Sequence, residues 1–454
     1  YILFFLSGVA GLGYEILWTR MFAVSLGHEI AGMLAVVSAF FSGIALGGWV
    51  FDKPVSKSST PARWYVALEL LIGLWALALT VIIPKANPVI ANLIGLEPSF
   101  LHHWAVAFLL PFLLLLPATT AMGGTLAAMD RFFGQLQAEQ SVAGLYGANT
   151  FGAMAGTLCT TFLIIPALGM SATSMLLAAI NIVGGAGVYW LSRSRAAAQT
   201  EYRENTPRPP VQVRLYLALF VTGLLGIGFE VLMVRTLSQI LENTIFTFAS
   251  LLSIYLFGTA TGASLYQRYG KNTECDTGLT FLLQVTALFC LGSIYLLRFA
   301  ETIYSGVTQF YGRGFWASVL SEMTLGFLVF FLPTMMMGAT FSHLARNLRG
   351  PDGGVGRALS INTLGGALAP VVFAIWLLPQ LGIKYVFLIA AGGYLLLIPR
   401  IRLSALPIAA IALAGIAFIV IEPYPYRFVT LKPGEKLVFH REGIMAAVSV
   451  VQDD

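Results

Sequence analysis

The chain has 454 residues, of which 57% are hydrophobic and only 10% are charged, and its formal net charge is +5. A soluble globular protein carries about 25% charged residues, so this chain has too few charges to cover a water-facing surface of its size. The composition therefore excludes disordered, collagen-like and nucleic-acid-wrapping proteins and predicts an all-α polytopic membrane protein.

Long apolar runs follow one another along the chain, and each can supply the roughly 20 mostly apolar residues that a membrane-spanning helix needs. The runs are unbroken, without the alternation of a membrane β-barrel. We predict thirteen spanning helices, at residues 1–26, 30–51, 62–83, 104–130, 139–163, 170–191, 213–240, 244–267, 277–298, 316–345, 355–378, 383–399 and 404–421.

An internal repeat relates the two halves of the chain. The segment from Phe5 to Arg20 recurs 215 positions later as Phe220 to Arg235, with glycines and a glutamate at matching places. Glycines and rare polar residues that recur in step indicate a duplication rather than a shared apolar bias. Further matches, at a shift of 215 or 213, pair Gly43 with Gly258, Gly47 with Gly262, Glu69 with Gln284, Asn149 with Asn362, and Gly169 with Gly382.

Each half holds six predicted spans, so both halves insert in the same direction, as in major-facilitator-like proteins with parallel repeats. We therefore expect five parts. They are a first six-helix repeat at 1–191, a basic linker at 192–212, a second repeat at 213–399, an additional transmembrane helix at 404–421, and the start of a soluble β-containing domain at 422–454.

The positions of the cations predict the orientation of the protein. Loops after odd-numbered spans hold only Lys85, Arg298, Arg313 and Lys384. We therefore expect an integral protein of the cytoplasmic membrane of a prokaryote, with a cytoplasmic N-terminus and a tail on the opposite side. Loops after even-numbered spans hold sixteen cations, namely Lys53, Lys57, Arg63, Arg131, Arg193, Arg195, Arg203, Arg208, Arg214, Arg268, Lys271, Arg346, Arg349, Arg357, Arg400 and Arg402.

Four charged residues are predicted inside the hydrocarbon, where an ionisable side chain normally faces protein and is paired. They are Glu15, Arg20, Glu230 and Arg235. Within one helix the Glu and the Arg lie about 140° apart around the axis, so they do not face each other well. We expect Glu15 to meet Arg235 and Glu230 to meet Arg20 across the repeat axis. Such pairs would be either a structural clasp or a substrate or proton site.

Glu69 and Gln284 are a second matched pair, with an acid in the first half and a neutral amide in the second. A lone buried Glu is either a protonated, hydrogen-bonded group or a site for a cationic amine. Asn149 and Asn362 lie beside small residues and are expected to form interhelical hydrogen bonds in glycine seams such as Gly43-xxx-Gly47.

No catalytic, cofactor or metal site is predicted. Cys159, Cys275 and Cys290 form no CxxC pair, and the histidines lack metal-ligand spacing. The basic pI of about 9.1 reflects cytoplasmic loops beside lipid headgroups rather than nucleic-acid binding. At the C-terminal end, residues 436–451 read as two short strands around a turn at Glu442-Gly443.

The motifs FFLSGVAGLGYEILWTRMF, FFSGIALGGWVFDK, ALELLIGLWAL, PATTAMGGTL, LYGANTFGAMAGT and LVFHREGIMAAVSVV together resemble the membrane-embedded spermidine synthase-like proteins. The resemblance implies a multi-span domain that precedes a polyamine aminopropyltransferase-like domain, with decarboxylated S-adenosylmethionine as co-substrate. The nucleoside-binding loop and acidic residues of that catalytic domain have no counterpart in residues 1–454. No catalytic residue is therefore carried over, and enzymatic activity is left open.

Three functions follow as expectations. The first is the membrane domain of a spermidine synthase-like fusion that anchors an aminopropyltransferase-type domain in polyamine metabolism. The second is a secondary transporter of polyamines or other cations, with Glu15, Glu69 and Glu230 in its cavity. The third is a non-catalytic scaffold subunit of a larger membrane complex. The expected partners are the lipid bilayer, a cationic small molecule and other membrane subunits, and no nucleic acid.

Overall fold

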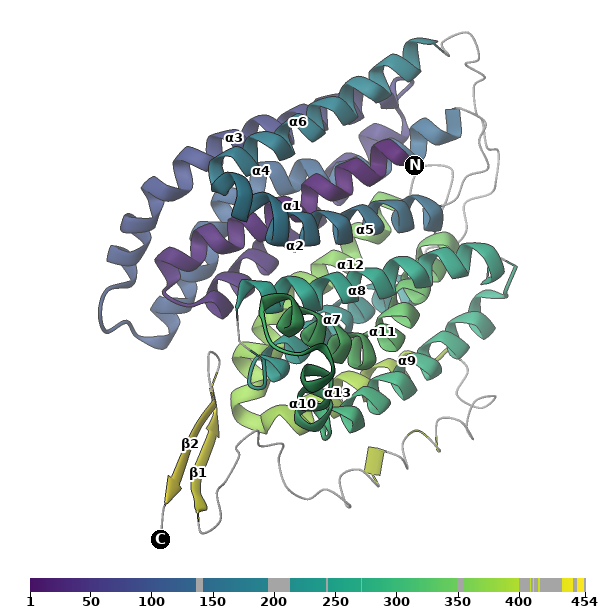
Figure 1. Cartoon of the computed structure of the whole chain (residues 1–454). Coiled ribbons are helices and arrows are strands. Elements are labelled where there is room, and N and C mark those ends of the chain that lie inside the picture. Colours follow the sequence, from purple (N-terminus) through teal and green to yellow (C-terminus); the bar gives the residue numbers. More distant parts are fainter. Residues whose placement is uncertain are drawn as a thin grey trace.

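The structure is a computed structural model of the whole chain, shown in Figure 1. It describes residues 1–135, 142–194, 213–241, 244–270, 272–348, 355–399, 409, 411, 415–416, 435–443 and 447–452. The predicted inter-repeat linker and most of the predicted span 404–421 lie outside the described residues.

Helices occupy the other twelve predicted spans, which confirms an all-α polytopic membrane protein. The first half consists of α1 (Ile2–Leu26), α2 (Glu29–Ser56), α3 (Pro61–Ile94), α4 (Phe100–Gln135), α5 (Val142–Cys159) and α6 (Ile165–Ser194). The second half consists of α7 (Val213–Leu237), α8 (Ile245–Leu265), α9 (Cys275–Leu297), α11 (Phe315–Asn347), α12 (Val355–Ala369) and α13 (Leu378–Leu395).

Ten helical stretches of the described chain are long and apolar enough to cross a membrane. Two of them, 144–193 and 355–395, are interrupted by Gly169 and Gly382, whose φ is 74° in both cases. A glycine adopts this left-handed conformation without the penalty of a Cβ. The chain bends there, so α5 and α6 both lie against α1, while α12 and α13 both lie against α7.

Equivalent helices of the two halves make equivalent contacts, as the repeat predicts. Helix α1 packs on α5 as α7 packs on α12, and α2 packs on α4 as α8 packs on α11. The halves meet through α2 with α12 on one side and through α5 with α8 on the other. The pseudo-two-fold axis that relates the two halves maps one of these interfaces onto the other. The repeats therefore form two parallel six-helix bundles joined side by side (Figure 1).

The predicted glycine seams are filled by helices of the same chain. A Cβ on Gly47 of α2 would overlap the Thr120 carbonyl oxygen of α4, and one on Gly262 of α8 would overlap that of Met335 in α11. The matched asparagines also act as predicted. Asn149 Nδ2 donates to the Phe4 carbonyl oxygen at 3.1 Å, and Asn362 Nδ2 donates to that of Leu219 at 2.9 Å.

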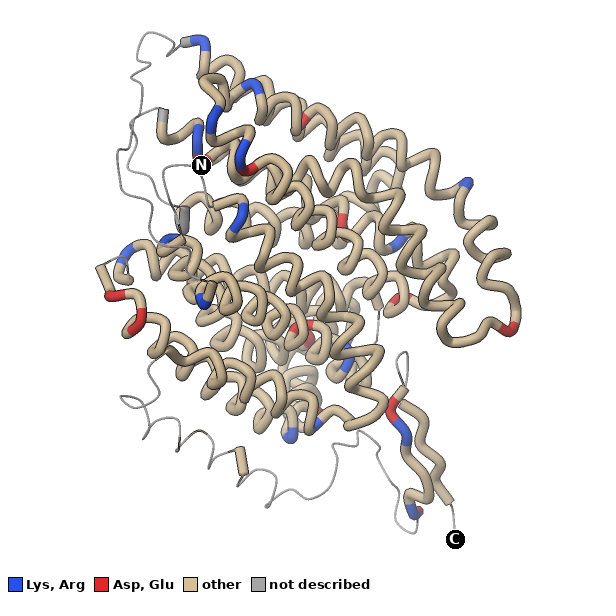
Figure 2. Tube along the Cα trace, turned by 180° about the vertical axis from the view of Figure 1, so that it is seen from behind, with Lys and Arg blue, Asp and Glu red and all other residues tan. Residues whose placement is uncertain are grey.

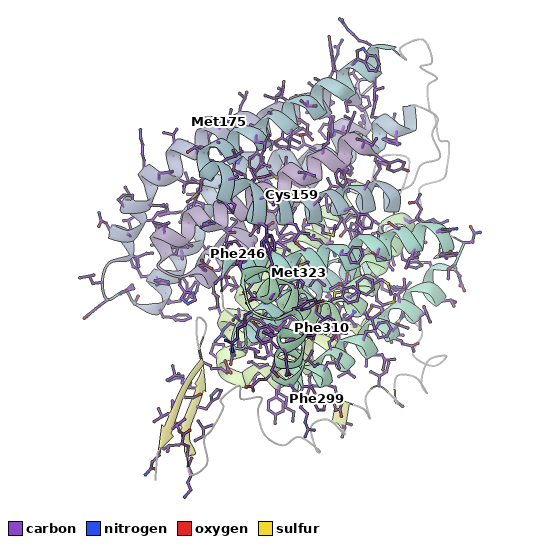
Figure 3. The ribbon with its side chains drawn as sticks, viewed as in Figure 1. Cys159, Met175, Phe246, Phe299, Phe310 and Met323 are labelled. Carbon is purple, nitrogen blue, oxygen red and sulfur yellow. The ribbon has the colours of Figure 1, made fainter. Side chains whose placement is uncertain are left out.

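One helix was not predicted, the short α10 (Ala300–Tyr311) between α9 and α11. It has twelve residues, too few to cross a bilayer. Its sequence is amphipathic, with Ile303 and Tyr304 packed against the core and Phe310 84% exposed. Figure 3 labels Phe299 and Phe310, which mark the two ends of this helix.

A β-hairpin follows the bundle, at the end opposite the N-terminus (Figure 1). It consists of β1 (Lys436–Glu442) and β2 (Ala447–Gln452), paired antiparallel. The two predicted strands are thereby confirmed, with the connection beginning at Gly443. Lys and Arg residues gather mainly at the other end of the bundle, near the N-terminus (Figure 2).

Candidate functional site

A cavity of about 200 Å³ lies between the two halves. Repeat-equivalent residues face each other across it, because α1 and α7, which carry the duplicated segment, line its opposite walls. The equivalent lining pairs include Ser7 and Thr222, Gly8 and Gly223, Gly11 and Gly226, Glu15 and Glu230, Phe40 and Tyr255, Met122 and Met337, Asn149 and Asn362, Thr150 and Thr363, and Asn181 and Tyr394.

Glu15 and Glu230 are the two carboxyl groups of this cavity. They are 2% and 6% exposed and lie close enough to interact electrostatically. Neither forms a hydrogen bond or an ion pair within the described part of the chain. Two buried carboxyl groups without a partner are costly in an apolar interior. They are therefore available to an incoming ligand.

The rest of the cavity wall is aromatic and neutral. Tyr146 and Phe341 lie with their ring centroids 4.6 Å apart, and Tyr255 packs edge-on against a core phenylalanine. None of the described lining residues is Lys, Arg or His. A site with two acidic groups, several aromatic rings and no cation of its own favours positively charged ligands.

The predicted pairs Glu15–Arg235 and Glu230–Arg20 are wrong. Each arginine lies five residues after its glutamate, which is about 7.5 Å further along the helix axis. The arginines therefore lie beyond the cavity, towards the end of the bundle that carries the hairpin. There Arg20 lies near Glu29 of α2, and Arg235 contacts the hairpin instead of a carboxyl group of the cavity.

Arg235 anchors the hairpin to the end of α7. Its Nη2 atom lies 3.6 Å from Glu442 Oε2 and donates to the Gly443 carbonyl oxygen at 3.1 Å. Gln239, one turn further on, also donates to Glu442 Oε2, at 3.4 Å. Arg235 is only 2% exposed, and a buried charge is costly to leave unpaired.

We therefore expect Glu442→Gln to release the hairpin, since it removes the negative partner of a buried arginine at a cost of about 3–5 kcal/mol. Hydrogen exchange of residues 436–452 should become much faster, with little change in the helices. Arg441→Gln is the matched control, because Arg441 lies on the same strand and is exposed. Unchanged exchange in the Glu442 variant would contradict the anchor.

His28, in the turn between α1 and α2, caps the start of α2. Its Nδ1 accepts a hydrogen bond from the Ile30 backbone N–H at 3.1 Å. Burial, and then the positive charge of Arg235, lower the pKa of the His28 imidazole. A neutral ring is needed because protonated Nδ1 cannot accept this bond.

The stability that His28 contributes is present above its ordinary pKa of about 6.5 and is lost as the pH falls through its lower folded-state pKa. We expect hydrogen exchange of residues 28–32 to rise between neutral and mildly acidic pH. His28→Asn keeps an N-cap acceptor that does not titrate, so the pH dependence of this segment should become clearly smaller. A pH dependence equal to that of the wild type would contradict this assignment.

Glu69 lies behind the cavity wall rather than in it. Its carboxylate accepts hydrogen bonds from Ser7 Oγ at 2.7 Å and from Asn181 Nδ2 at 2.5 Å, and the Tyr14 hydroxyl donates to Asn181 Oδ1 at 3.0 Å. Glu69 was identified from the sequence as a candidate but Asn181 was missed, although an isolated amide in an apolar span could have been recognised as a candidate in the same way. Gln284, the counterpart of Glu69, has a buried Nε2 atom that finds no hydrogen-bond partner in the described part of the chain.

Polar contacts tie the halves together on the α2–α12 side. Ser38 Oγ donates to the Ala367 carbonyl oxygen at 3.0 Å, and Asp52 lies 3.8 Å from Arg357. On the α5–α8 side, the rings of Phe151 in α5 and Phe257 in α8 lie with their centroids 6.2 Å apart, and Phe162, just after α5, lies 5.5 Å from Phe246 in α8. Phe246 is labelled in Figure 3, where it lies between the two halves.

Among the described residues, no group of three or more His, Cys, Asp and Glu side chains is placed to hold a metal ion. The predicted candidates thus separate into three places. Glu15, Glu230, Asn149 and Asn362 line the cavity, Glu69 and Gln284 lie in the third helix of each half, and Arg20 and Arg235 lie towards the hairpin end.

No family model matches this chain. Among curated proteins, it is 24% identical over 206 residues to polyamine aminopropyltransferases 2 and 1 of Ralstonia nicotianae (strain ATCC BAA-1114 / GMI1000). The match covers 44% of this chain and 36% and 35% of the two relatives, so it spans about a third of their length.

Among solved structures, the chain is similar to a bacterial homologue of the iron transporter ferroportin in the outward-facing state, with a TM-score of 0.49 and 16% identity over 93% of this chain and 99% of the other. It is also similar to the proton:xylose symporter XylE, with a TM-score of 0.49 and 13% identity over 93% of this chain and 96% of the other.

Proposed function

We propose that this protein is a secondary transporter of organic cations, and that Glu15 and Glu230 bind the cationic group or groups of the substrate. The observation that carries the proposal is the pair of repeat-equivalent carboxyl groups in the cavity between the halves, neither of which has a partner among the residues that the structure describes. Binding sites of parallel-repeat transporters lie at such an interface.

The chemistry of the cavity favours an elongated diamine or polyamine. Two buried carboxylates repel each other, and a ligand with two ammonium groups neutralises both at once. The aromatic rings of Tyr146 and Tyr255 offer cation–π contacts to the same groups, and the apolar wall accommodates the methylene chain between them. A cavity of about 200 Å³ is of the size of a small diamine rather than a sugar-nucleotide or a peptide.

The two interfaces between the halves suggest how access alternates. Each half packs internally through glycine seams and moves as a unit, whereas α2 with α12 and α5 with α8 provide surfaces that can slide or rock. We propose that the basic end near the N-terminus faces the cytoplasm of a prokaryote, so that the Arg235 end with its hairpin faces outwards.

Uptake into proteoliposomes tests the transport function. Radiolabelled putrescine should enter in a saturable, protein-dependent manner and should exchange with unlabelled putrescine. Succinate is the matched control, because it has the same four-carbon length but carries two negative charges. Equal transport of both compounds, or of neither, would contradict a cation transporter.

A second function is favoured by the similarity to polyamine aminopropyltransferases. In this alternative, the bundle anchors an aminopropyltransferase-type domain that the docked hairpin begins, and decarboxylated S-adenosylmethionine is its co-substrate. Sequencing the gene beyond the codon for Asp454 tests it, because a Gly-rich loop followed by acidic residues would support it and a stop codon would contradict it. The scaffold alternative loses its main argument, since helices of the same chain fill the described glycine seams.

A further inference from the structure

We propose that Glu69 is the proton-binding site of this transporter and that it couples outward proton release to substrate entry in a proton–cation antiport. The proposal rests on the proposed transport function. It is carried by the position of a fully buried carboxyl group one hydrogen bond behind the substrate cavity, and by the absence of that group from the other half.

The first observation is the set of groups around Glu69. Both carboxylate oxygens are held by neutral donors, Ser7 of α1 and Asn181 of α6. The titratable groups that face it are Tyr14 of α1 and Tyr65 of its own helix α3. Within the described chain its partners include no Lys, Arg or His. A buried acid without a cation exists readily in both the charged and the neutral form only if hydrogen bonds support each.

The local hydrogen bonds meet this requirement. Ser7 donates to the charged carboxylate, and the same hydroxyl can accept a hydrogen bond from the protonated acid. The buried Tyr65 hydroxyl lies beside the Glu69 carboxyl group and the Ser7 hydroxyl and interacts with both. The Tyr65 hydroxyl is therefore a third neutral donor that can support the charged form of Glu69.

The second observation is that both primary partners of Glu69 also line the substrate cavity. Ser7 and Asn181 each donate a hydrogen bond to Glu69, and both also line the cavity that Glu15 lines. A proton that arrives in the cavity thus reaches Glu69 through a single hydroxyl. When Glu69 becomes charged, the Ser7 hydroxyl turns towards it and the negative field in the cavity increases. A cation then binds more tightly.

The duplication supplies an internal comparison. The positions equivalent to Ser7, Tyr14, Tyr65, Glu69 and Asn181 are occupied by Thr222, Phe229, Thr280, Gln284 and Tyr394. The helices pack alike in both halves, and both asparagine–carbonyl bonds are kept. The fold therefore does not need an acid at this position. The carboxyl group of Glu69 and the amide of Asn181 are replaced in the second half, whereas the hydroxyl of Ser7 is kept as Thr222. The acid itself is therefore specific to one half, as a functional group would be.

The test uses purified full-length protein in vesicles with radiolabelled putrescine. With the interior about one pH unit more acidic and the membrane potential clamped at zero by potassium and valinomycin, exchange of one proton per putrescine dication drives up to about tenfold accumulation. Potassium efflux carries the remaining positive charge. We expect Glu69→Gln, which copies the amide of the second half, to exchange putrescine at the wild-type rate without any gradient. It should lose the pH-driven accumulation and the accompanying alkalinisation of the lumen. Glu97→Gln, in an exposed loop, is the control and should behave as the wild type.

The outcomes separate the two proposals. If the wild type does not exchange putrescine, the transport function fails. If it exchanges but Glu69→Gln still accumulates putrescine under the pH gradient, or if a sodium gradient replaces the pH gradient, the proton site is wrong. Infrared spectroscopy gives a readout that does not depend on transport. The carboxylic acid carbonyl signal that titrates with pH should be smaller in Glu69→Gln than in the wild type and in Glu97→Gln, while the buried Glu15 and Glu230 contribute equally to all three. Equal signals in the wild type and in Glu69→Gln would overturn the assignment.

Discussion

Replacing Glu15 or Glu230 by glutamine should weaken diamine binding by about thirtyfold or more, because loss of one partner of a buried charge pair costs at least about 2 kcal/mol. The two single variants should have similar effects, since the residues are repeat-equivalent and face the same cavity. Equilibrium binding of radiolabelled putrescine to the detergent-solubilised protein measures the effect directly.

The same substitutions should stabilise the empty protein. Glu15 and Glu230 are both buried and close enough to interact, so each disfavours ionisation of the other, and a neutral amide at either position removes the cost of burying that charge. We expect a higher midpoint of thermal unfolding without putrescine, and a smaller increase on its addition than in the wild type. Glu97→Gln controls for a general effect of removing a carboxylate. Wild-type putrescine affinity in both cavity variants would exclude these residues from the binding site.

Replacing Gly47 or Gly262 by alanine should strongly destabilise the bundle. At each position the new methyl group would overlap a backbone carbonyl oxygen of the neighbouring helix, that of Thr120 or Met335. Backbone atoms cannot move aside as a flexible side chain does, so α2 would have to separate from α4, or α8 from α11. Overpacking typically costs about 1–3 kcal/mol, and we expect the upper end of this range.

The midpoint of thermal unfolding in detergent measures this effect, and Gly292→Ala in α9 is the matched control. A Cβ at Gly292 meets no atom within 4 Å, and alanine favours a helix over glycine by about 1 kcal/mol. The control should therefore be neutral or slightly stabilising. Equal stability of Gly47→Ala and Gly292→Ala would show that the α2–α4 seam tolerates separation.

The parts of the site that the sequence predicted well are those that the duplication marks. Asn149 and Asn362 bond to repeat-equivalent carbonyl oxygens as expected, and Glu15 and Glu230 reach a common cavity. The partners of the charged residues were predicted poorly. Arg235 binds the hairpin, which lies more than 200 positions later in the chain, and Glu69 binds Ser7 and Asn181 on two other helices.

The sequence by itself determined that this protein crosses the membrane many times and consists of two related halves, because apolar span length and glycine spacing are local properties that the bilayer and close helix packing impose. Only the tertiary structure decided which of its few charged groups meet. Helix rotation and the approach of distant helices set those distances, and a five-residue offset along α1 and α7 was enough to separate the arginines from the cavity. The same packing left two carboxyl groups facing the cavity and a third just behind its wall.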